Sequence, residues 1–127
     1  GKTFGELGAL LRRSARPERL GVCIDTCHLF AAGYPLDTAE GVARSLVEMR
    51  VHRLTRRLRV VHANDAKGAR GSHRDRHEHI GEGFIGDEGF RAILADPAVR
   101  RAAVLIETPG RLEEDRRNLE RLRRLMV

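Results

Sequence analysis

The sequence has no tryptophan, and only 4% of its 127 residues are aromatic. It contains two cysteines, Cys23 and Cys27, too few for a disulfide framework and not in the Cys-x-x-Cys spacing of redox or zinc sites. No apolar run approaches the roughly 20 residues of a membrane span, and the first residues lack the layout of a signal peptide. We therefore expect a cytoplasmic protein with reduced cysteines and no membrane contact.

Lysine is also scarce. Only Lys2 and Lys67 are lysines, so 22 of the 24 basic residues are arginine, and the formal net charge is +6. Because guanidinium groups bind phosphate in a bidentate fork, this charge favours an anionic partner such as nucleic acid. The alternative is that these arginines only cover solvated helix faces, as the pairs near residues 56, 116 and 123 would.

Helical and strand patterns alternate along the chain. Cys23 lies in the first apolar run, where we expect a small core residue, and we expect Cys27 to be a packed thiol. Short apolar runs typical of strands buried on both faces alternate with amphipathic helices. A long charged loop follows the second apolar run. The predicted strands are 20–24, 59–62 and 102–106, the helices 3–15, 39–58, 87–94 and 111 onward, and the loop 63–86.

This order predicts parallel strands joined by helical crossovers. Three strands are too few for a closed (β/α)8 barrel, which takes about 250 residues. The chain also begins with Gly1 rather than methionine. The predicted fold class is thus α/β, with residues 1–127 forming the C-terminal part of a TIM barrel.

Each predicted strand ends in a side chain that can bind a metal ion. Asp25 follows the first run, His62 the second and Glu107 the third. Because the carboxyl ends of parallel strands meet at one mouth, we expect these three side chains to converge.

Three further candidates lie in the loops at that mouth. His28 is three residues after Asp25, and the long loop carries Asp75 and His77. Mixed imidazole and carboxylate ligands suit Zn²⁺, with Mn²⁺ or Fe²⁺ as alternatives. Six ligands exceed the needs of one tetrahedral zinc ion, so the pattern predicts more than one ion, a device used in phosphate-ester hydrolysis.

These residues lie in strings that resemble the signatures of the endonuclease IV family of abasic-site endonucleases. The strings are Gly-Val-Cys-Ile-Asp-Thr-Cys-His at 21–28, His-Ala-Asn-Asp-Ala-Lys at 62–67, Asp-Arg-His at 75–77, Ile-Gly-Glu-Gly-Phe-Ile-Gly at 80–86 and Ile-Glu-Thr at 106–108. The resemblance covers the chain from about residue 3. It implies a TIM barrel with three zinc ions that cleaves double-stranded DNA 5′ to an abasic site, leaving a 3′-hydroxyl and a 5′-deoxyribose phosphate.

The resemblance also implies roles for individual residues. Asp25, His62 and Glu107 would bind one zinc ion, and His28, Asp75 and His77 another, with no separate catalytic side chain assigned. Arg76, Lys67 and Asn64 would contact DNA, although Arg76 could instead pair with a neighbouring carboxylate. The family's first barrel half is absent, so we expect this chain alone to complete at most one zinc site, and the full-length protein to be a monomer.

Two other functions compete with this prediction. A metal-dependent sugar isomerase or epimerase of the xylose-isomerase-like group also places acidic residues and histidines at strand ends. A catalytically dead binding module or structural half-barrel would bind no metal at these positions.

Overall fold

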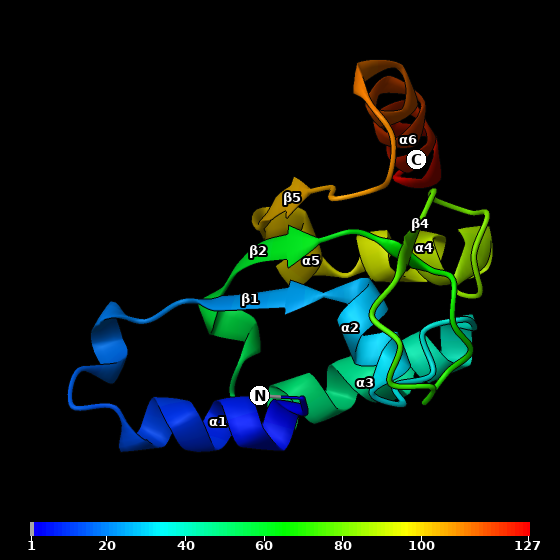
Figure 1. The fold of residues 1–127 in the computed structure, drawn as a ribbon. Helices are drawn as coiled ribbons and strands as arrows, with labels where there is room; N and C mark the ends of the chain where they lie inside the picture. The colour runs from blue at the N-terminus through cyan, green and yellow to red at the C-terminus, as the bar shows by residue number, and fades with distance from the viewer. Residues whose placement is uncertain (1) are drawn as a thin grey trace.

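A three-stranded parallel sheet forms the centre of the computed structural model, which describes residues 2–127. Strand β2 is central, with β1 on one side and β5 on the other (Figure 1). The strands are β1 (Val22–Asp25), β2 (Leu58–His62) and β5 (Ala103–Leu105). The expected parallel strands with flanking helices are confirmed, and they make a partial barrel.

Residues 2–127 form six α-helices, and the loop after β2 contains a short antiparallel pair. The helices are α1 (Phe4–Arg13), α2 (Thr26–Ala31), α3 (Ala39–Val51), α4 (Gly86–Ala95), α5 (Pro97–Arg101) and α6 (Leu112–Leu125). The antiparallel pair is β3 (Asp65–Ala66) and β4 (His77–Glu78), and the 3₁₀ turns are η1 (Pro17–Arg19) and η2 (Thr55–Arg57). None of the helices within residues 2–127 has the length and apolarity needed to cross a membrane.

Helix α3 is shorter than the predicted helix over 39–58. It ends at Val51, and Arg53 takes a left-handed conformation with φ 59° that turns the chain toward β2. Leu54 and Leu58 are buried although they lie beyond the helix. Their burial explains why the apolar spacing predicted a longer helix. Two short helices were missed, α2 and α5, because six and five residues are too few to show a helical period.

The sheet is covered on one face only, which corrects the expectation of strands buried on both faces. Val22, Ile24 and Val61 are buried under the helices, whereas Leu105 is 49% exposed on the opposite face. Cys23 also lies on the open face and is exposed, so the prediction that it is a core residue is wrong. In a closed barrel this face points inward and is packed by other strands. Cys27 is buried and free, as predicted.

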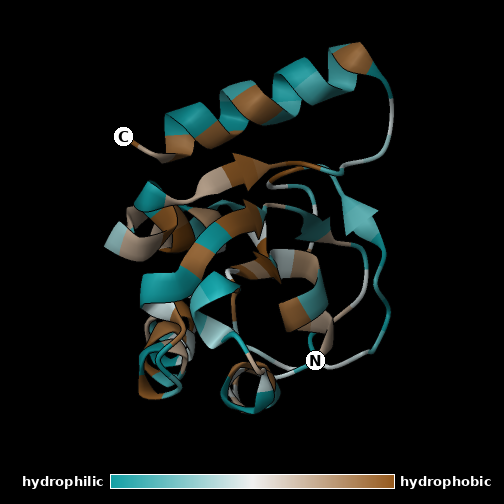
Figure 2. Ribbon diagram, turned by 90° about the vertical axis from the view of Figure 1, so that its left-hand side faces the viewer, coloured by the Kyte–Doolittle hydropathy of each residue, from teal (hydrophilic) through white to brown (hydrophobic). Residues whose placement is uncertain are grey.

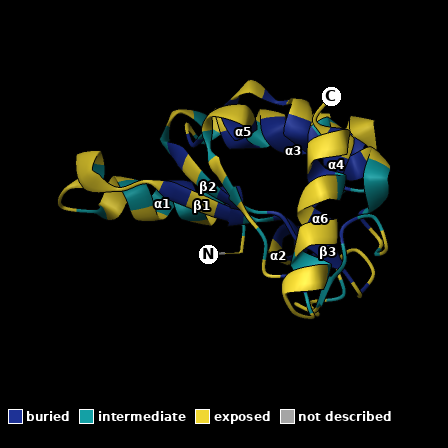
Figure 3. Cartoon of the chain, turned by 90° about the horizontal axis from the view of Figure 1, so that it is seen from above, coloured by how far each residue is buried: buried dark blue, intermediate teal, exposed yellow. Residues whose placement is uncertain are grey.

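Helix α6 packs against α4, and most of its residues are exposed (Figure 3). Its sequence is largely hydrophilic with isolated apolar residues (Figure 2). Leu122 and Leu125 are buried against the rest of the chain, whereas Leu112 is 67% exposed. This helix therefore contributes to the core through one narrow apolar stripe.

Gly41 gives a test of how α3 packs. A Cβ atom at this position would overlap the carbonyl oxygen of Pro35, so Gly41→Ala is expected to lower the free energy of unfolding by about 2 kcal/mol. Gly5, in α1, has room for a Cβ atom, whose nearest neighbour would be His52 at 3.5 Å. Gly5→Ala is expected to raise stability by about 0.5 kcal/mol, because alanine favours the helix. Thermal unfolding of both variants checks the pair, and equal midpoints would contradict the packing of α3 on Pro35.

Candidate metal centre

The carboxyl ends of the three parallel strands lie at one edge of the sheet (Figure 1). Asp25 and His62 are the last residues of β1 and β2 and are paired in register. His62 Nδ1 lies 3.7 Å from Asp25 Oδ2 and 3.3 Å from Glu107 Oε2. The expected convergence of Asp25, His62 and Glu107 is therefore present.

The other three predicted ligands adjoin this group. His77 Nε2 lies 3.8 Å from Asp25 Oδ2 and 3.4 Å from Asp75 Oδ1. Asp75 Oδ2 in turn lies 3.9 Å from His28 Nδ1. All six side chains thus form one continuous group, named here the ligand cluster: Asp25, His28, His62, Asp75, His77 and Glu107.

Local secondary structure fixes the backbone positions of the residues in the ligand cluster. Asp25 is the N-cap of α2, because its Oδ1 accepts a hydrogen bond of 3.0 Å from the His28 N–H. His77 lies in β4 and pairs with Ala66 in β3. One carboxylate therefore both ends a strand and begins the helix that carries the next candidate ligand.

The orientation of the His77 ring favours metal binding. Its Nδ1 lies 2.8 Å from the carbonyl oxygen of Glu107, which can only accept, so Nδ1–H is the donor. In a neutral ring the lone pair is then on Nε2, which faces Asp25 and Asp75. A backbone carbonyl that sets the tautomer in this way is typical of histidines that bind metals.

His77 lies between the two predicted zinc sites. His77 belongs to two groups whose potential ligand atoms lie within 4.8 Å of one another. One group is Asp25, His77 and Glu107, and the other is Cys27, Asp75 and His77. The resemblance implied that His77 belongs with His28 and Asp75 alone, whereas the structure places it equally beside the strand-end carboxylates.

Cys27 lies beside the cluster without being exposed. Its Sγ donates to the carbonyl oxygen of Arg76 at 3.4 Å. Burial, assisted by the neighbouring Asp75, raises the pKa of the Cys27 thiol to about 12. Cys27 is therefore a packed, protonated thiol in this structure.

The donor set fits divalent cations. Asp25, Asp75 and Glu107 converge on one mouth, yet within residues 2–127 no lysine or arginine nitrogen lies within 4.0 Å of their carboxylate oxygens. Three unbalanced carboxylates facing imidazole nitrogens repel one another unless a cation lies between them. Mixed nitrogen and oxygen ligands suit zinc and similar ions.

Two of the three predicted DNA contacts border the cluster. Lys67 and Arg76 are exposed, and the Lys67 N–H donates to the Arg76 carbonyl at 2.9 Å, which places them side by side. Both line an open cavity of about 410 Å³ together with Asp75, His77 and Glu107. In the described part of the chain, Arg76 pairs with neither neighbouring carboxylate. It is free to meet a phosphate group.

Asn64 is different, because it does not line this cavity, and its contact with DNA stays a prediction. Its side chain is 0% exposed. Its side-chain amide makes two hydrogen bonds within the protein. The nitrogen donates to Asp25, and the oxygen accepts from the Glu107 N–H. In this structure the Asn64 side chain therefore faces the protein interior rather than the surface.

Sequence reasoning missed Asp65, the next residue. Asp65 is 0% exposed, and its carboxylate accepts hydrogen bonds from the backbone N–H groups of the next residue, of the loop between β4 and α4, and of the first residue of α4. Burial raises the pKa of Asp65, and the N–H groups oppose that rise. The donors are those of Ala66, Gly81, Gly83, Ile85 and Gly86. The glycine-rich string was the available signal, because such a loop needs a buried acceptor for its N–H groups.

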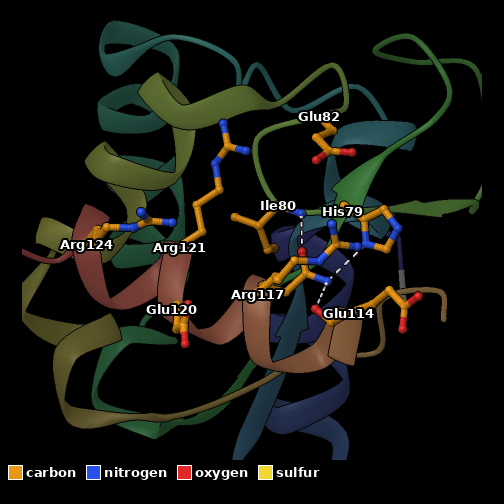
Figure 4. A pocket seen from close by; sticks show the side chains of 9 residues that line it. His79, Ile80, Glu82, Glu114, Arg117, Glu120, Arg121 and Arg124 are labelled. Atoms are coloured by element: carbon orange, nitrogen blue, oxygen red, sulfur yellow. Dashed lines mark hydrogen bonds between the residues drawn. The ribbon is translucent and has the colours of Figure 1, made fainter. Parts of the chain in front are cut away.

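A second cavity, of about 180 Å³, lies between α6 and the loop that follows β4 (Figure 4). None of the ligand cluster lines it. Asn118 of α6 accepts from the Ile80 N–H at 2.8 Å there, and Arg121 makes a two-pronged pair with Asp87 that lowers the pKa of that carboxyl group. These bonds hold the loop and the first turn of α4 against α6 rather than form a second reactive group.

Parallel strands with helical crossovers, and a group of potential metal ligands at their carboxyl ends, are typical of a metal-binding α/β barrel. A family model described as the xylose isomerase-like TIM barrel matches residues 1–125. The chain belongs to that family.

Within the family, the chain is similar to endonuclease IV proteins, as the sequence strings predicted. It is 50% identical over 126 residues to a probable endonuclease 4 of Methanoculleus marisnigri, covering 98% of this chain and 45% of the relative. It is 44% identical to the probable endonuclease 4 of Persephonella marina, with 99% and 44% covered. The crystal structure of endonuclease IV from Thermus thermophilus matches with a TM-score of 0.84 and 38% identity, over 99% of this chain and 44% of that one. The chain thus spans somewhat under half the length of these relatives.

Proposed function

We propose that the intact protein is a zinc-dependent endonuclease that hydrolyses the phosphodiester bond 5′ to abasic sites in double-stranded DNA. The products would carry a 3′-hydroxyl and a 5′-deoxyribose phosphate. The observation that carries the proposal is the ligand cluster beside Lys67 and Arg76, in a chain 50% identical to a relative named probable endonuclease 4.

The ligand cluster divides naturally between two ions. Asp25, His62 and Glu107 would hold one zinc ion, and His28 with Asp75 the other. His77 is placed to serve either, since its Nε2 faces both groups. A third zinc ion, implied by the resemblance, would be held mainly by residues outside this chain.

When bound, the ions would supply positive charge that stabilises the developing charge on the phosphate oxygens. The residues of this chain would position the DNA. Lys67 and Arg76, exposed at the cavity beside the cluster, would contact phosphate groups and set the register of the strand. Such contacts carry no sequence information, which suits an enzyme that finds a lesion rather than a sequence.

The sugar isomerase alternative rests on the shared barrel fold, while the names of the relatives favour the nuclease. Aldose–ketose turnover by the intact protein would revive it. A monomeric state, a cytoplasmic location and the treatment of residues 1–127 as one domain stay predictions.

The test is incision of a labelled duplex that contains one synthetic abasic site. We expect a single cut 5′ to the site, with a 3′ end that a DNA polymerase extends. A chelator is expected to lower the rate by about 1,000-fold, because metal ions contribute several kcal/mol to such reactions, and added zinc should restore it. The same duplex without the lesion is the control. Metal-replete protein that leaves the abasic duplex intact would refute the proposal.

A further inference from the structure

Asn64 lies two residues after the end of the central strand, β2, and its backbone is hydrogen-bonded to the first residue of α2. The Asn64 N–H donates to Thr26 Oγ1 at 2.9 Å, and the Thr26 hydroxyl donates to the Asn64 carbonyl at 2.6 Å. Both residues are buried, with exposed fractions of 0% and 1%. Because Thr26 immediately follows Asp25, these two bonds fix the distance between the ends of β1 and β2.

The Asn64 side chain spans the other two strand ends. Its Nδ2 donates to Asp25 Oδ2 at 2.9 Å, and its Oδ1 accepts from the Glu107 N–H at 2.7 Å. The orientation of the amide follows from chemistry, since a carboxylate only accepts and a backbone N–H only donates. An amide is therefore suited to link these two groups, and neither a carboxylate nor a hydrocarbon side chain could make both bonds.

Asp25 Oδ2, the atom held by Asn64, also faces the imidazoles of the cluster. It lies 3.7 Å from His62 Nδ1 and 3.8 Å from His77 Nε2. Asn64 itself is fully covered in this structure. Any effect it has on metal binding must pass through Asp25 and Glu107.

We propose that Asn64 is a positioning residue whose buried amide sets the spacing of Asp25 and Glu107, so that both carboxylates bind the same metal ion. The inference rests on the proposed metal site. Hydrogen-bonded partners of ligating carboxylates tune metal affinity, and their loss typically costs about 10- to 100-fold.

The experiment compares Asn64→Ala with wild type in the intact, metal-stripped protein, using Co²⁺ as a visible probe and Zn²⁺ in competition. At least one Co²⁺ ion is expected to bind about 10- to 100-fold more weakly in Asn64→Ala, with an altered visible spectrum. Ser45→Ala is the matched control, because the Ser45 hydroxyl is also buried but bonds to Gly41 within α3. It should keep the wild-type affinity and spectrum.

Asn64→Asp provides a second test in case the alanine variant does not fold. It keeps the shape of the side chain and the acceptor for the Glu107 N–H, but it places an oxygen where Nδ2 lies 2.9 Å from Asp25 Oδ2. Repulsion should move Asp25, so an altered Co²⁺ spectrum is expected.

Unchanged affinity and spectrum in the Asn64 variants, with only a lower unfolding temperature, would overturn the proposal. Wild-type protein that binds no metal would overturn it together with the proposed function. Wild-type protein that binds metal without cutting abasic DNA would refute the nuclease alone, and the Asn64 comparison would still decide the positioning role.

Discussion

Replacing His77 with alanine is expected to remove zinc from both parts of the ligand cluster. The His77 Nε2 atom lies 3.4 Å from Asp75 and 3.8 Å from Asp25, and His77 is the residue common to the two close groups of ligands. Its loss leaves carboxylates on both sides without their shared nitrogen partner. We expect zinc affinity to fall by at least about 100-fold, more than for loss of a supporting group. Mass spectrometry of chelator-washed intact protein measures the zinc that remains.

A second substitution separates ligation from structure at this position. His77→Asn keeps a side-chain N–H near the Glu107 carbonyl, where the His77 Nδ1 contact is 2.8 Å, but removes Nε2. It should lose zinc as His77→Ala does. His52, at the end of α3 and beside Gly5 and Gly8, is the matched control, and His52→Ala should keep its zinc. Zinc retained by His77→Asn would show that only the hydrogen bond matters, and unchanged zinc in His77→Ala would support the dead-module alternative.

Replacing Asp65 with alanine is expected to produce the largest loss of stability. The carboxylate is completely buried, with Oδ1 accepting from the Ala66 and Ile85 N–H groups at 2.8 and 2.9 Å and Oδ2 from the Gly81 and Gly83 N–H groups at 2.8 and 3.1 Å. Alanine would leave these donors without partners. Because each buried unsatisfied donor costs about 1–3 kcal/mol and some will find water, we expect a net loss of about 4 kcal/mol. Urea unfolding of the intact protein measures it.

Two further variants are compared with Asp65→Ala: Asp65→Asn, and Glu113→Ala, which removes an exposed carboxylate. The asparagine side chain has the same shape as aspartate but would point its NH₂ group at backbone donors on one side, so Asp65→Asn should lose a large part of the same stability. Glu113→Ala, in the exposed first turn of α6, should cost less than about 1 kcal/mol. If Asp65→Ala unfolds at the same urea concentration as Glu113→Ala, the loop does not depend on this carboxylate.

Loss of the Asp65 hydrogen bonds should also weaken zinc binding at the ligand cluster. The loop held by Asp65 follows β4, and Asp65 pairs with Glu78, the neighbour of His77. Loosening the loop therefore frees the strand that carries His77. Reduced zinc affinity in Asp65→Asn, under conditions where the variant is folded, is the result that this connection implies.

The order of apolar runs determined the parallel sheet, because the runs of four or five residues were separated by long segments that each contain a helix. The same pattern placed Asp25, His62 and Glu107 together, since parallel strands bring their carboxyl ends to one edge. The quoted strings identified the family. These features depend on local spacing and on one topological rule, and a sequence displays both.

Tertiary structure alone decided the rest. Asn64 and Asp65 are polar residues in a loop by sequence, yet both are buried, because backbone N–H groups from distant segments require acceptors there. Cys23 resembled a core residue, yet it lies on a face that nothing covers within residues 2–127. His77 was assigned to one predicted zinc site, but its position in β4 places it beside potential ligands of both. Burial, hydrogen-bond partners and shared ligands depend on contacts between residues about 15 to 50 positions apart, which no local pattern in the sequence records.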